Sequence, residues 1–352
     1  MSLPIVHAEL SGLEVTRFGG EEAEWDRFVM REPGCTVCHL AAWRKILSDA
    51  LGVENTYLVA RDDEGNWRGA LPLVRVRSRL FGHYLVSMPY LNYGGPVGTP
   101  AAAARLADAA VTEARRSRAD LLELRSRTHF TASLQVSDRK ITVLLDLPES
   151  ADRLWQDVFP AKLRSQIRRP IKEGMTARFG LEELGAFYDV FARHMRDLGT
   201  PVLPRRLFEL IAAQLPAHTE IGVVYRGAEP VAGGFGFRWR DEFEVTWAAA
   251  LKDHNRSAPN MLLYWSFMER MIGLGVGMFN FGRCTPGGGT HRFKQQWGGR
   301  DLPLPWRQWS ASAVDATPTP QRPLYRVAAG VWQRLPLALT NWAGPALARR
   351  IP

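Results

Sequence analysis

Apolar residues recur at intervals of three and four over several stretches of the chain, a spacing typical of amphipathic helices. These stretches are Glu21–Arg31, His39–Leu51, Ala101–Ser117, Leu181–Leu198, Pro204–Leu215 and Ala258–Ile272. Ser257 precedes the last stretch as an expected N-cap, and Pro259 lies in its first turn. Gly273 and Gly275 mark its expected end. We therefore predict that each of these stretches forms a helix.

Runs rich in β-branched and aromatic residues alternate with these helices and indicate strands. The runs are Thr56–Arg61, Trp67–Arg77, Leu121–Arg125, Ile141–Leu147, Glu220–Tyr225, Pro230–Arg238, Glu242–Ala250 and Met278–Phe281. Asp62–Asn66 has the residues of a tight hairpin turn. Each half thus runs through helices, an antiparallel hairpin, a helix and a strand. This order predicts two copies of one α/β unit.

The last forty residues have a different pattern. Ser310–Arg322 is rich in Ser, Ala, Thr and Pro and predicts a linker. Apolar residues at helical spacing follow from Leu324 to Trp342, accompanied by arginines. Such a tail can lie on an anionic membrane or pack on the body of the protein, and both interpretations stay open. We expect domains at residues 1–158 and 159–312, with the linker and tail at 313–352.

Bulk composition narrows the class of protein. The chain has 352 residues, of which 46% are hydrophobic and 23% charged, and this length fits two folded domains. Met1–Gly20 lacks the basic start and apolar run of a secretory signal, and three cysteines make no disulfide framework. These features predict a cytoplasmic protein, with contact to the inner membrane through the tail as the open alternative. The net charge of +9 favours phosphate-bearing partners.

Phe279–Gly299 is the most unusual segment of the chain. A predicted strand leads into a loop with Gly282, Gly287, Gly288 and Gly289, and a basic, aromatic run follows. Glycines let backbone N–H groups approach a ligand closely, and successive N–H groups can hold a phosphate or an oxyanion. The same segment supplies Arg283, His291, Arg292 and Lys294. The pattern indicates an anion-binding site.

A second basic segment is Ala161–Arg169. Arg164, Arg168 and Lys172 are spaced by four and share one stripe of a helix, which suits phosphate. The adjacent stripe holds Leu163, Ile167 and Ile171, which we expect to anchor the helix to the core. Pro170 is expected to kink or end it.

Three motifs resemble the FemAB family of acyltransferases. Phe281-Gly282, Phe293-Lys294 and Trp297-Gly298-Gly299 are similar to the closing motif of that family. Ala161–Arg169 is similar to its basic helix, and His39–Trp43 to a helix near its N-terminus. The resemblance covers roughly residues 20–310 and looks closest to the FemAB-like proteins associated with exosortase (PEP-CTERM) and exopolysaccharide systems.

The resemblance implies an α/β fold of two tandem GNAT-like domains, each a mixed, largely antiparallel sheet flanked by helices, with a C-terminal helical tail. It also implies transfer of an acyl or aminoacyl group to an amine. Lys294 becomes the best candidate for stabilising negative charge, and His291 is a candidate base. The expected substrate-binding residues are Lys162, Arg164, Arg168, Gly282, Arg283, Thr290, Arg292 and Phe293.

We therefore expect an N-acyltransferase or aminoacyltransferase acting on an amine of a cell-envelope or exopolysaccharide precursor. Acyl-CoA, acyl-carrier protein and aminoacyl-tRNA all stay open as the donor co-substrate. No permanently bound cofactor, metal or DNA is expected. The rival is a non-catalytic protein that binds phosphate, nucleic acid or a membrane surface in a polysaccharide assembly system; it predicts binding that falls steeply with salt.

Two further patterns match known binding motifs, for haem and for pyrophosphate, but their context in the sequence argues against both functions. Cys35–His39 fits the C-x-x-C-H pattern of haem attachment, which requires export from the cytoplasm. Arg270–Gly275 fits an R-x-x-G-x-G pyrophosphate loop. That loop must lead into a helix N-terminus, whereas these glycines follow a predicted helix and are better interpreted as its C-cap.

Overall fold

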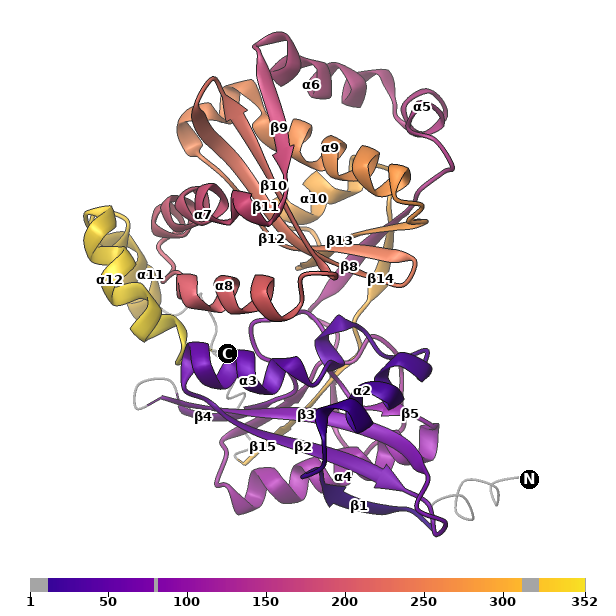
Figure 1. The fold of residues 1–352 in the computed structure, drawn as a ribbon. Helices are drawn as coiled ribbons and strands as arrows, with labels where there is room; N and C mark the ends of the chain where they lie inside the picture. Colours follow the sequence, from indigo (N-terminus) through magenta and orange to yellow (C-terminus); the bar gives the residue numbers. More distant parts are fainter. Residues whose placement is uncertain (1–11, 79–81, 312–322, 352) are drawn as a thin grey trace. The chain divides into compact units, whose positions relative to one another are not determined.

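The computed structural model describes residues 12–78, 82–311 and 323–351 (Figure 1). The chain divides into two compact units. The first contains residues 1–140, 303–318 and 349–352, and the second contains residues 141–302 and 319–348. Each unit is a mixed sheet flanked by helices, which confirms the expected α/β class.

The elements of the first unit are, in chain order, β1 (Glu14–Arg17), α2 (Glu22–Arg31), η1 (Val37–His39), α3 (Ala42–Leu51), β2 (Glu54–Arg61), β3 (Trp67–Ser78), β4 (Gly82–Val86), β5 (Val97–Gly98), α4 (Pro100–Arg116), β6 (Leu121–Leu124), β7 (Gln135–Ser137) and β15 (Trp306–Ser310). The sheet order is β1-β2-β3-β4-β6-β15-β7, and β5 pairs with β3. β4 and β6 are parallel, while β2, β3 and β4 form an antiparallel meander.

The elements of the second unit are, in chain order, β8 (Ile141–Asp146), α5 (Ala151–Arg153), η2 (Leu154–Val158), α6 (Ala161–Lys172), β9 (Met175–Phe179), η3 (Leu181–Glu183), α7 (Leu184–Leu198), α8 (Arg205–Gln214), β10 (Thr219–Arg226), β11 (Glu229–Trp239), β12 (Glu242–Ala250), η4 (Lys252–Ser257), α9 (Pro259–Gly273), β13 (Met278–Cys284), α10 (Gly289–Gln295) and β14 (Arg300–Pro303). The sheet order is β14-β8-β13-β12-β11-β10-β9. β12 and β13 are parallel, and β10, β11 and β12 form an antiparallel meander.

The two sheets share one connection pattern. In each, an antiparallel meander is followed by a helix and then by a strand parallel to the last strand of the meander. α4 makes this connection in the first unit and α9 in the second. The internal repeat expected from element order is therefore present in the topology.

Each sheet is also completed by a strand from the other half of the sequence. β8 precedes the second meander by many residues, yet it pairs with β13. β15 follows the second meander, yet it pairs with β6 and β7 of the first sheet. The compact units consequently divide near residues 140 and 302, whereas we expected limits at 158 and 312. Those limits remain a prediction for independently folding domains.

The core of the second unit determines how its helices lie. α9 is the most buried helix, with Leu263, Phe267 and Met268 fully enclosed against the sheet. α6 buries Leu163 and Ile167 as expected, but Ile171 is exposed and Pro170 is buried in its place. Pro170 lies inside α6, which ends two residues later at Lys172.

The two ends of α9 can be compared with the sequence prediction, which places Ser257 at its start and Gly273 and Gly275 at its end. The N-cap of α9 is Ala258, at φ 54°, and not Ser257. Ser257 instead contributes a side-chain hydrogen bond that lowers the pKa of Glu173. At the other end, Gly275 adopts φ 74° after the last turn of α9, and its N–H donates to Ile272 O. The glycines of Arg270–Gly275 therefore end a helix, as predicted.

The tail forms two helices, α11 (Pro323–Trp332) and α12 (Leu337–Ala348). A Cβ placed at Gly344 would lie 3.1 Å from Val202 N, and one at Gly199 would lie 2.7 Å from Ala329 Cβ. The tail thus packs on the second unit, to which it belongs. Its outer side carries exposed Val327, Val331, Leu339 and Trp342. Most of the expected linker, residues 312–322, lies outside the described residues.

Candidate functional site

The parallel strands β12 and β13 pair over only part of their length in the second sheet. Their described register contains three pairs, from Glu242–Met278 to Glu244–Asn280. Beyond this point β12 continues to Ala250 and β13 to Cys284. We call residues 245–250 and 281–284 the strand fork. A strand whose backbone has stopped pairing can offer that edge to another extended chain.

A β-bulge lies on each strand at the base of the strand fork. On β12, the register with β11 passes from Val245–Gly236 to Trp247–Phe235 and leaves Thr246 as the extra residue. On β13, the register with β8 passes from Asn280–Leu144 to Arg283–Thr142. Bulges bend a strand and re-aim its side chains, and they are frequent beside active sites.

Asn280 holds the bulge of β13 in place. It is fully buried, and its Oδ1 accepts hydrogen bonds from Gly282 N at 2.8 Å and from the Thr142 hydroxyl. Its Nδ2 donates to Glu242 at 2.7 Å. Gly282 adopts φ 71°, a conformation that other residues rarely take. The bulge therefore requires both the asparagine and the glycine.

Lys294 reaches the same bulge from α10. Its Nζ donates to the carbonyl oxygens of Gly282, at 2.6 Å, and Arg283, at 3.0 Å. The side chain is only 4% exposed. Burial lowers the pKa of Lys294 to about 8, although the nearby charges of Cys284 and Glu244 oppose this shift. The structure thus places a desolvated, easily deprotonated amine at the strand fork.

The polar groups around Lys294 include residues that sequence reasoning missed. Glu244 is 8% exposed, and its Oε1 accepts a hydrogen bond from the Thr246 hydroxyl at 2.9 Å. Cys284 is buried at the end of β13. The alternation of Glu242 and Glu244 with Phe243 and Val245 could have revealed Glu244, because it puts both carboxylates on the face opposite the core.

The aromatic residues of the motif pack together with Tyr264 and Phe159 next to the bulge of β13. Tyr264 of α9 stacks on Phe281 at 5.6 Å and meets Phe293 at 5.1 Å. Trp297 is fully buried and packs 5.5 Å from Phe159. A Cβ at Gly299 would lie 2.7 Å from Val143 Cγ1 and 2.9 Å from Leu144 O, so only glycine lets β8 pass.

Both ring nitrogens of His291 form hydrogen bonds, one with the glycine loop and one with β14. Its Nδ1 accepts a hydrogen bond from Gly287 N at 3.0 Å, and its Nε2 lies 2.9 Å from Asp301 Oδ2. These contacts define the tautomer with the proton on Nε2, which donates to the carboxylate. In this arrangement the ring fastens the glycine loop to β14, and neither nitrogen is open to a substrate proton.

Three other predicted residues of this segment lie nearer the surface. Arg292 is exposed and donates to Gly287 O at 2.8 Å. Thr290 is exposed at the start of α10, and Arg283 is partly buried on the β13 side of the strand fork. Arg283 lowers the pKa of Lys294 further.

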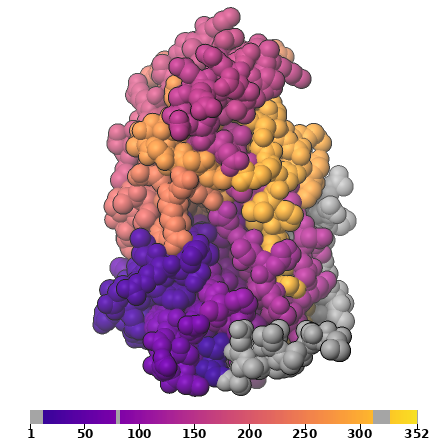
Figure 2. Space-filling model, turned by 90° about the vertical axis from the view of Figure 1, so that its right-hand side faces the viewer, coloured from indigo at the N-terminus to yellow at the C-terminus, as the bar shows by residue number. Residues whose placement is uncertain are grey.

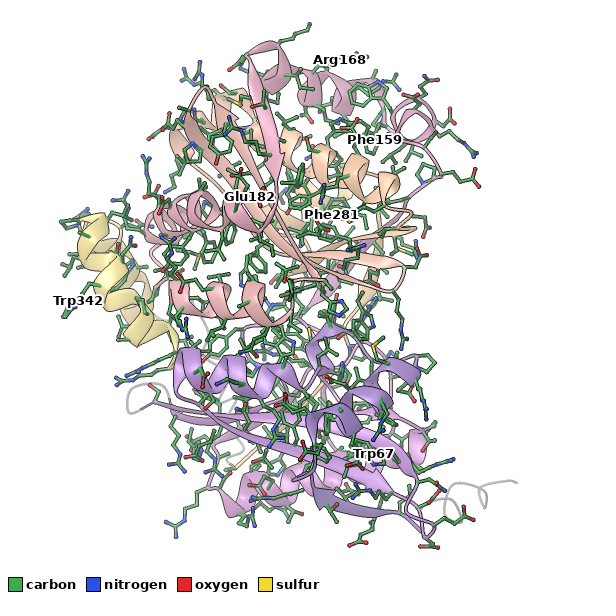
Figure 3. All side chains as sticks on the ribbon, in the orientation of Figure 1. Trp67, Phe159, Arg168, Glu182, Phe281 and Trp342 are labelled. Atoms are coloured by element: carbon green, nitrogen blue, oxygen red, sulfur yellow. The ribbon has the colours of Figure 1, made fainter. Side chains whose placement is uncertain are left out.

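The basic helix α6 serves a different part of the unit. Arg164 Nη1 donates to the carbonyl oxygens of Phe159, at 2.8 Å, Trp155, at 3.0 Å, and Gln156, at 3.3 Å, and so closes the end of η2. Arg168 lies over the Trp155 ring, and Lys162 is exposed. Figure 2 shows α5 and α6 on the outer surface. In Figure 3, Phe159 lies between Arg168 and Phe281.

Aromatic packing connects the end of η2, which Arg164 of α6 contacts, with the motif. Phe159 accepts from Arg164 through its carbonyl and packs on Trp297 through its ring. The contacts of Arg164 and Lys294 are to separate carbonyl groups. A single anion site made by both remains a prediction.

His39 of the Cys35–His39 motif is a core residue of the first unit. Its Nδ1 accepts from Thr36 N at 3.0 Å, and its Nε2 donates to Gly95 O at 3.0 Å. Burial lowers the pKa of His39 to about 4. Within the part of the chain that the structure describes, no three His, Cys, Asp or Glu side chains are grouped to hold a metal ion. No described helix combines the length and the apolar character needed to cross a membrane.

Residues 161–295 match the family model described as "Acetyltransferase (GNAT) domain". This range begins at the first residue of α6 and ends at the last residue of α10, so it includes both strands of the fork and Lys294. The matched range lies entirely within the second unit. A search of curated protein sequences finds no match to the chain.

Solved structures are similar over most of the chain. The crystal structure of FemX aligns with a TM-score of 0.61 at 14% identity, over 89% of this chain and all of FemX. The C-terminal domain of a putative lysylphosphatidylglycerol synthetase from Agrobacterium fabrum aligns with a TM-score of 0.56 at 14% identity, over 84% of this chain and 94% of that domain. A tandem GNAT protein from the clavulanic acid biosynthesis pathway aligns with a TM-score of 0.52 at 12% identity, over 86% and 100%. The chain has the tandem GNAT-like fold.

Proposed function

We propose that this chain is an N-acyltransferase or aminoacyltransferase whose acyl donor binds at the strand fork. The observation that carries the proposal is the parting of β12 and β13 between two bulges, inside the segment that matches the GNAT family model. An extended donor arm can add to the inner backbone edges there as a strand adds to a sheet.

Lys294 suits the chemistry of acyl transfer. The amine nitrogen attacks the acyl carbonyl carbon, a C–N bond forms, and negative charge develops on the carbonyl oxygen before the bond to the carrier breaks. A cation held by two carbonyl groups in a site of low dielectric can stabilise that oxygen without reorganising. Lys294 is the residue for which we propose this role.

The attacking amine must lose a proton, which the departing carrier finally takes up. We propose Glu244 as the proton acceptor, because it is a buried carboxylate beside Lys294 on the fork strand β12. His291 is assigned to positioning, since both of its nitrogens are used by the loop. We retain Lys162, Arg168, Arg283 and Arg292 as substrate-binding residues, because each carries positive charge at or near the surface.

The acceptor proposed is an amine of a cell-envelope or exopolysaccharide precursor in an exosortase-associated system, in the cytoplasm. Motif resemblance supports this finer assignment. The donor class is acyl-CoA, acyl-carrier protein or aminoacyl-tRNA.

A donor panel tests the proposal. The purified full chain is incubated with labelled acetyl-CoA, acyl-carrier protein or aminoacyl-tRNA and with amino-sugar nucleotides, and label on the acceptor is measured. We expect transfer from one donor class, with a loss of at least a hundredfold in Lys294→Met and none in Lys45→Met, an exposed control on α3. Salt-sensitive binding without transfer from any donor would favour the non-catalytic alternative instead.

We also propose that the tail touches an anionic membrane surface. Trp342 is 79% exposed, Val327, Val331 and Leu339 are exposed on the same two helices, and Figure 3 shows Trp342 pointing outward. Residues 323–352 contain four arginines and no acidic residue. Exposed apolar groups flanked by cations suit the interface of anionic lipids.

Vesicle sedimentation tests the membrane contact. We expect binding to phosphatidylglycerol vesicles, little to phosphatidylcholine vesicles, and a several-fold loss in the double variant Trp342→Ser, Val331→Ser. Met30→Ser, Val158→Ser removes two exposed apolar residues elsewhere and is the matched control. Equal binding by both double variants would exclude the tail as the contact.

A further inference from the structure

A small cavity of the first unit is lined mainly by arginines. It has a volume of about 270 Å³ and lies where the end of α3 and the start of β2 meet the end of β3 and residues 349–350. Its charged lining residues are Glu54, Arg75, Arg77, Arg349 and Arg350. The volume is slightly below the roughly 300–1,000 Å³ of sites for drug-sized ligands, so it suits a small group.

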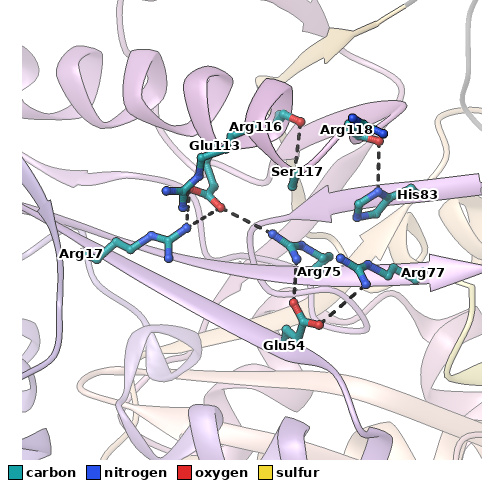
Figure 4. A network of polar contacts seen from close by, with 10 residues as sticks. Arg17, Glu54, Arg75, Arg77, His83, Glu113, Arg116, Ser117 and Arg118 are labelled. Atoms are coloured by element: carbon teal, nitrogen blue, oxygen red, sulfur yellow. Dashed lines mark hydrogen bonds and ion pairs between the residues drawn. The ribbon is translucent and has the colours of Figure 1, made fainter.

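The charge of this lining is strongly unbalanced. Four guanidinium groups face one carboxylate, which leaves three positive charges in excess among the described lining residues. Glu54 already accepts from Arg75 at 2.7 Å and lies 3.9 Å from Arg77 (Figure 4). The carbonyl end of α3, closed by Gly52, adds a partial negative charge, but this is about half an elementary charge. Most of the excess is therefore uncompensated.

Arg75 and the backbone of the segment with Arg349 and Arg350 are anchored within the first unit. Arg75 is mostly buried, with Nη2 also 3.6 Å from Glu113, and its buried Nε has no hydrogen-bond partner among the described residues. Tyr90 donates its hydroxyl to Arg349 O at 2.8 Å, which fastens the segment with Arg349 and Arg350 to this unit. An organised cluster of cations with an unused buried donor is the usual setting for a bound anion.

A second cavity of about 770 Å³ shares Arg77 and Arg350 with the first. His83 lines it, and its Nδ1 donates to Arg118 O at 3.0 Å. The buried Nε2 of His83 has no hydrogen-bond partner in the described part of the chain. Asp120 also lines this cavity, but it accepts a hydrogen bond from His83 N. A ligand whose charged group binds in the smaller cavity could therefore place its remaining atoms in the larger one.

We propose that the cavity formed by Arg75, Arg77, Arg349 and Arg350 binds a phosphate monoester or diphosphate group. Three excess positive charges match a diphosphate better than a single carboxylate. The planar guanidinium fork binds two phosphate oxygens at once, which favours phosphate over a simple counterion. The site is separate from the strand fork and does not depend on acyl transfer there.

Isothermal titration with two probes tests the site and distinguishes its source of phosphate. Sodium pyrophosphate represents a soluble phosphate, and dihexanoyl phosphatidic acid below its micelle concentration represents a lipid headgroup. We expect saturable binding of at least one probe, weakened at least tenfold by the double variant Arg349→Gln, Arg350→Gln and by Arg77→Gln. These residues are exposed enough that the variants should keep the melting temperature of the unchanged chain.

The matched control is Arg27→Gln, Arg31→Gln, which removes two exposed charges from α2. Pyrophosphate binding alone identifies a soluble ligand, and lipid binding alone identifies a headgroup; either result supports the site. Absence of binding by both probes would overturn the proposal and leave the arginines as caps of helix ends. Equal weakening in the control would also overturn it, because it would show only a diffuse positive field.

Discussion

Lys294 Nζ donates a hydrogen bond to Gly282 O over 2.6 Å, and this contact joins α10 to the bulge of β13. Twelve residues separate the two in the sequence. The left-handed backbone of Gly282 turns the strand, and the ammonium group covers the carbonyls that the bulge removes from regular pairing. One contact thus supports the fold and brings a cation to the strand fork.

Lys294 should make stability depend on pH. Its pKa is about 8 in the fold against 10.5 in the unfolded chain, so the unfolded state binds more protons between these values. The free energy of unfolding should therefore rise with pH from about 8 to 10.5, by up to about 3 kcal/mol at ~1.36 kcal/mol per pKa unit.

Denaturant titrations of the unchanged chain and of Lys294→Met across this range measure the effect. The difference in unfolding free energy between the two should move in favour of lysine as pH rises. A pH-independent difference would mean that the amine is not desolvated as the structure shows. Lys172→Met, on the exposed face of α6, provides the control.

His291 should affect activity through the loop and not through proton transfer. With Nδ1 bound to Gly287 N and Nε2 to Asp301, His291→Gln should lower kcat by less than about tenfold and leave the pH–rate profile unchanged in shape. Asp301→Asn should have a similar, smaller effect. Loss of one limb of the profile in His291→Gln would instead identify the imidazole as the general base.

His39 should weaken the first unit in acid. Burial lowers its pKa to about 4, while the unfolded value is 6.5. The unfolded state therefore binds more protons in this window, and stability should fall by up to about 3 kcal/mol as pH drops from 6.5 to 4. His39→Gln should flatten that slope, whereas exposed His129→Gln should not. Melting temperatures at several pH values decide between these outcomes.

Long, regular elements were the part of the fold that sequence could predict. The range expected for β12 agrees at both ends, and those for α2, α4, α8 and α9 agree within one residue. The short strands β1, β5, β7 and β14 were missed, because runs of two to four residues carry too little periodicity. The five-residue strands β4, β9 and β15 were also missed, and the pairing of β15 with β6 is set by contacts far apart in the chain.

Sequence could locate only part of the candidate site, because the position of its other residues depends on contacts between elements far apart in the chain. Gly282 and Lys294 meet at the bulge of β13, because the motif includes both the strand and the helix that returns to it. Phe293 of the same motif packs on Tyr264. Arg164 donates to carbonyl groups at the end of η2, an element with no sequence signature, and its expected place at an anion stays a prediction. Thr246 was missed, because its place as the extra residue of the bulge depends on the register of β12 against β11. Glu244 was missed although its alternation with Phe243 and Val245 marks it in the sequence.

Hydrogen–deuterium exchange of the full chain, with and without the donor that supports transfer, is the most direct measurement of donor binding at the strand fork. We predict slower exchange of the amides of residues 245–250 and 281–284 on donor addition, with this protection lost in Lys294→Met and retained in the exposed control Lys45→Met. Protection confined to other segments, with exchange at the strand fork unchanged, would contradict the account.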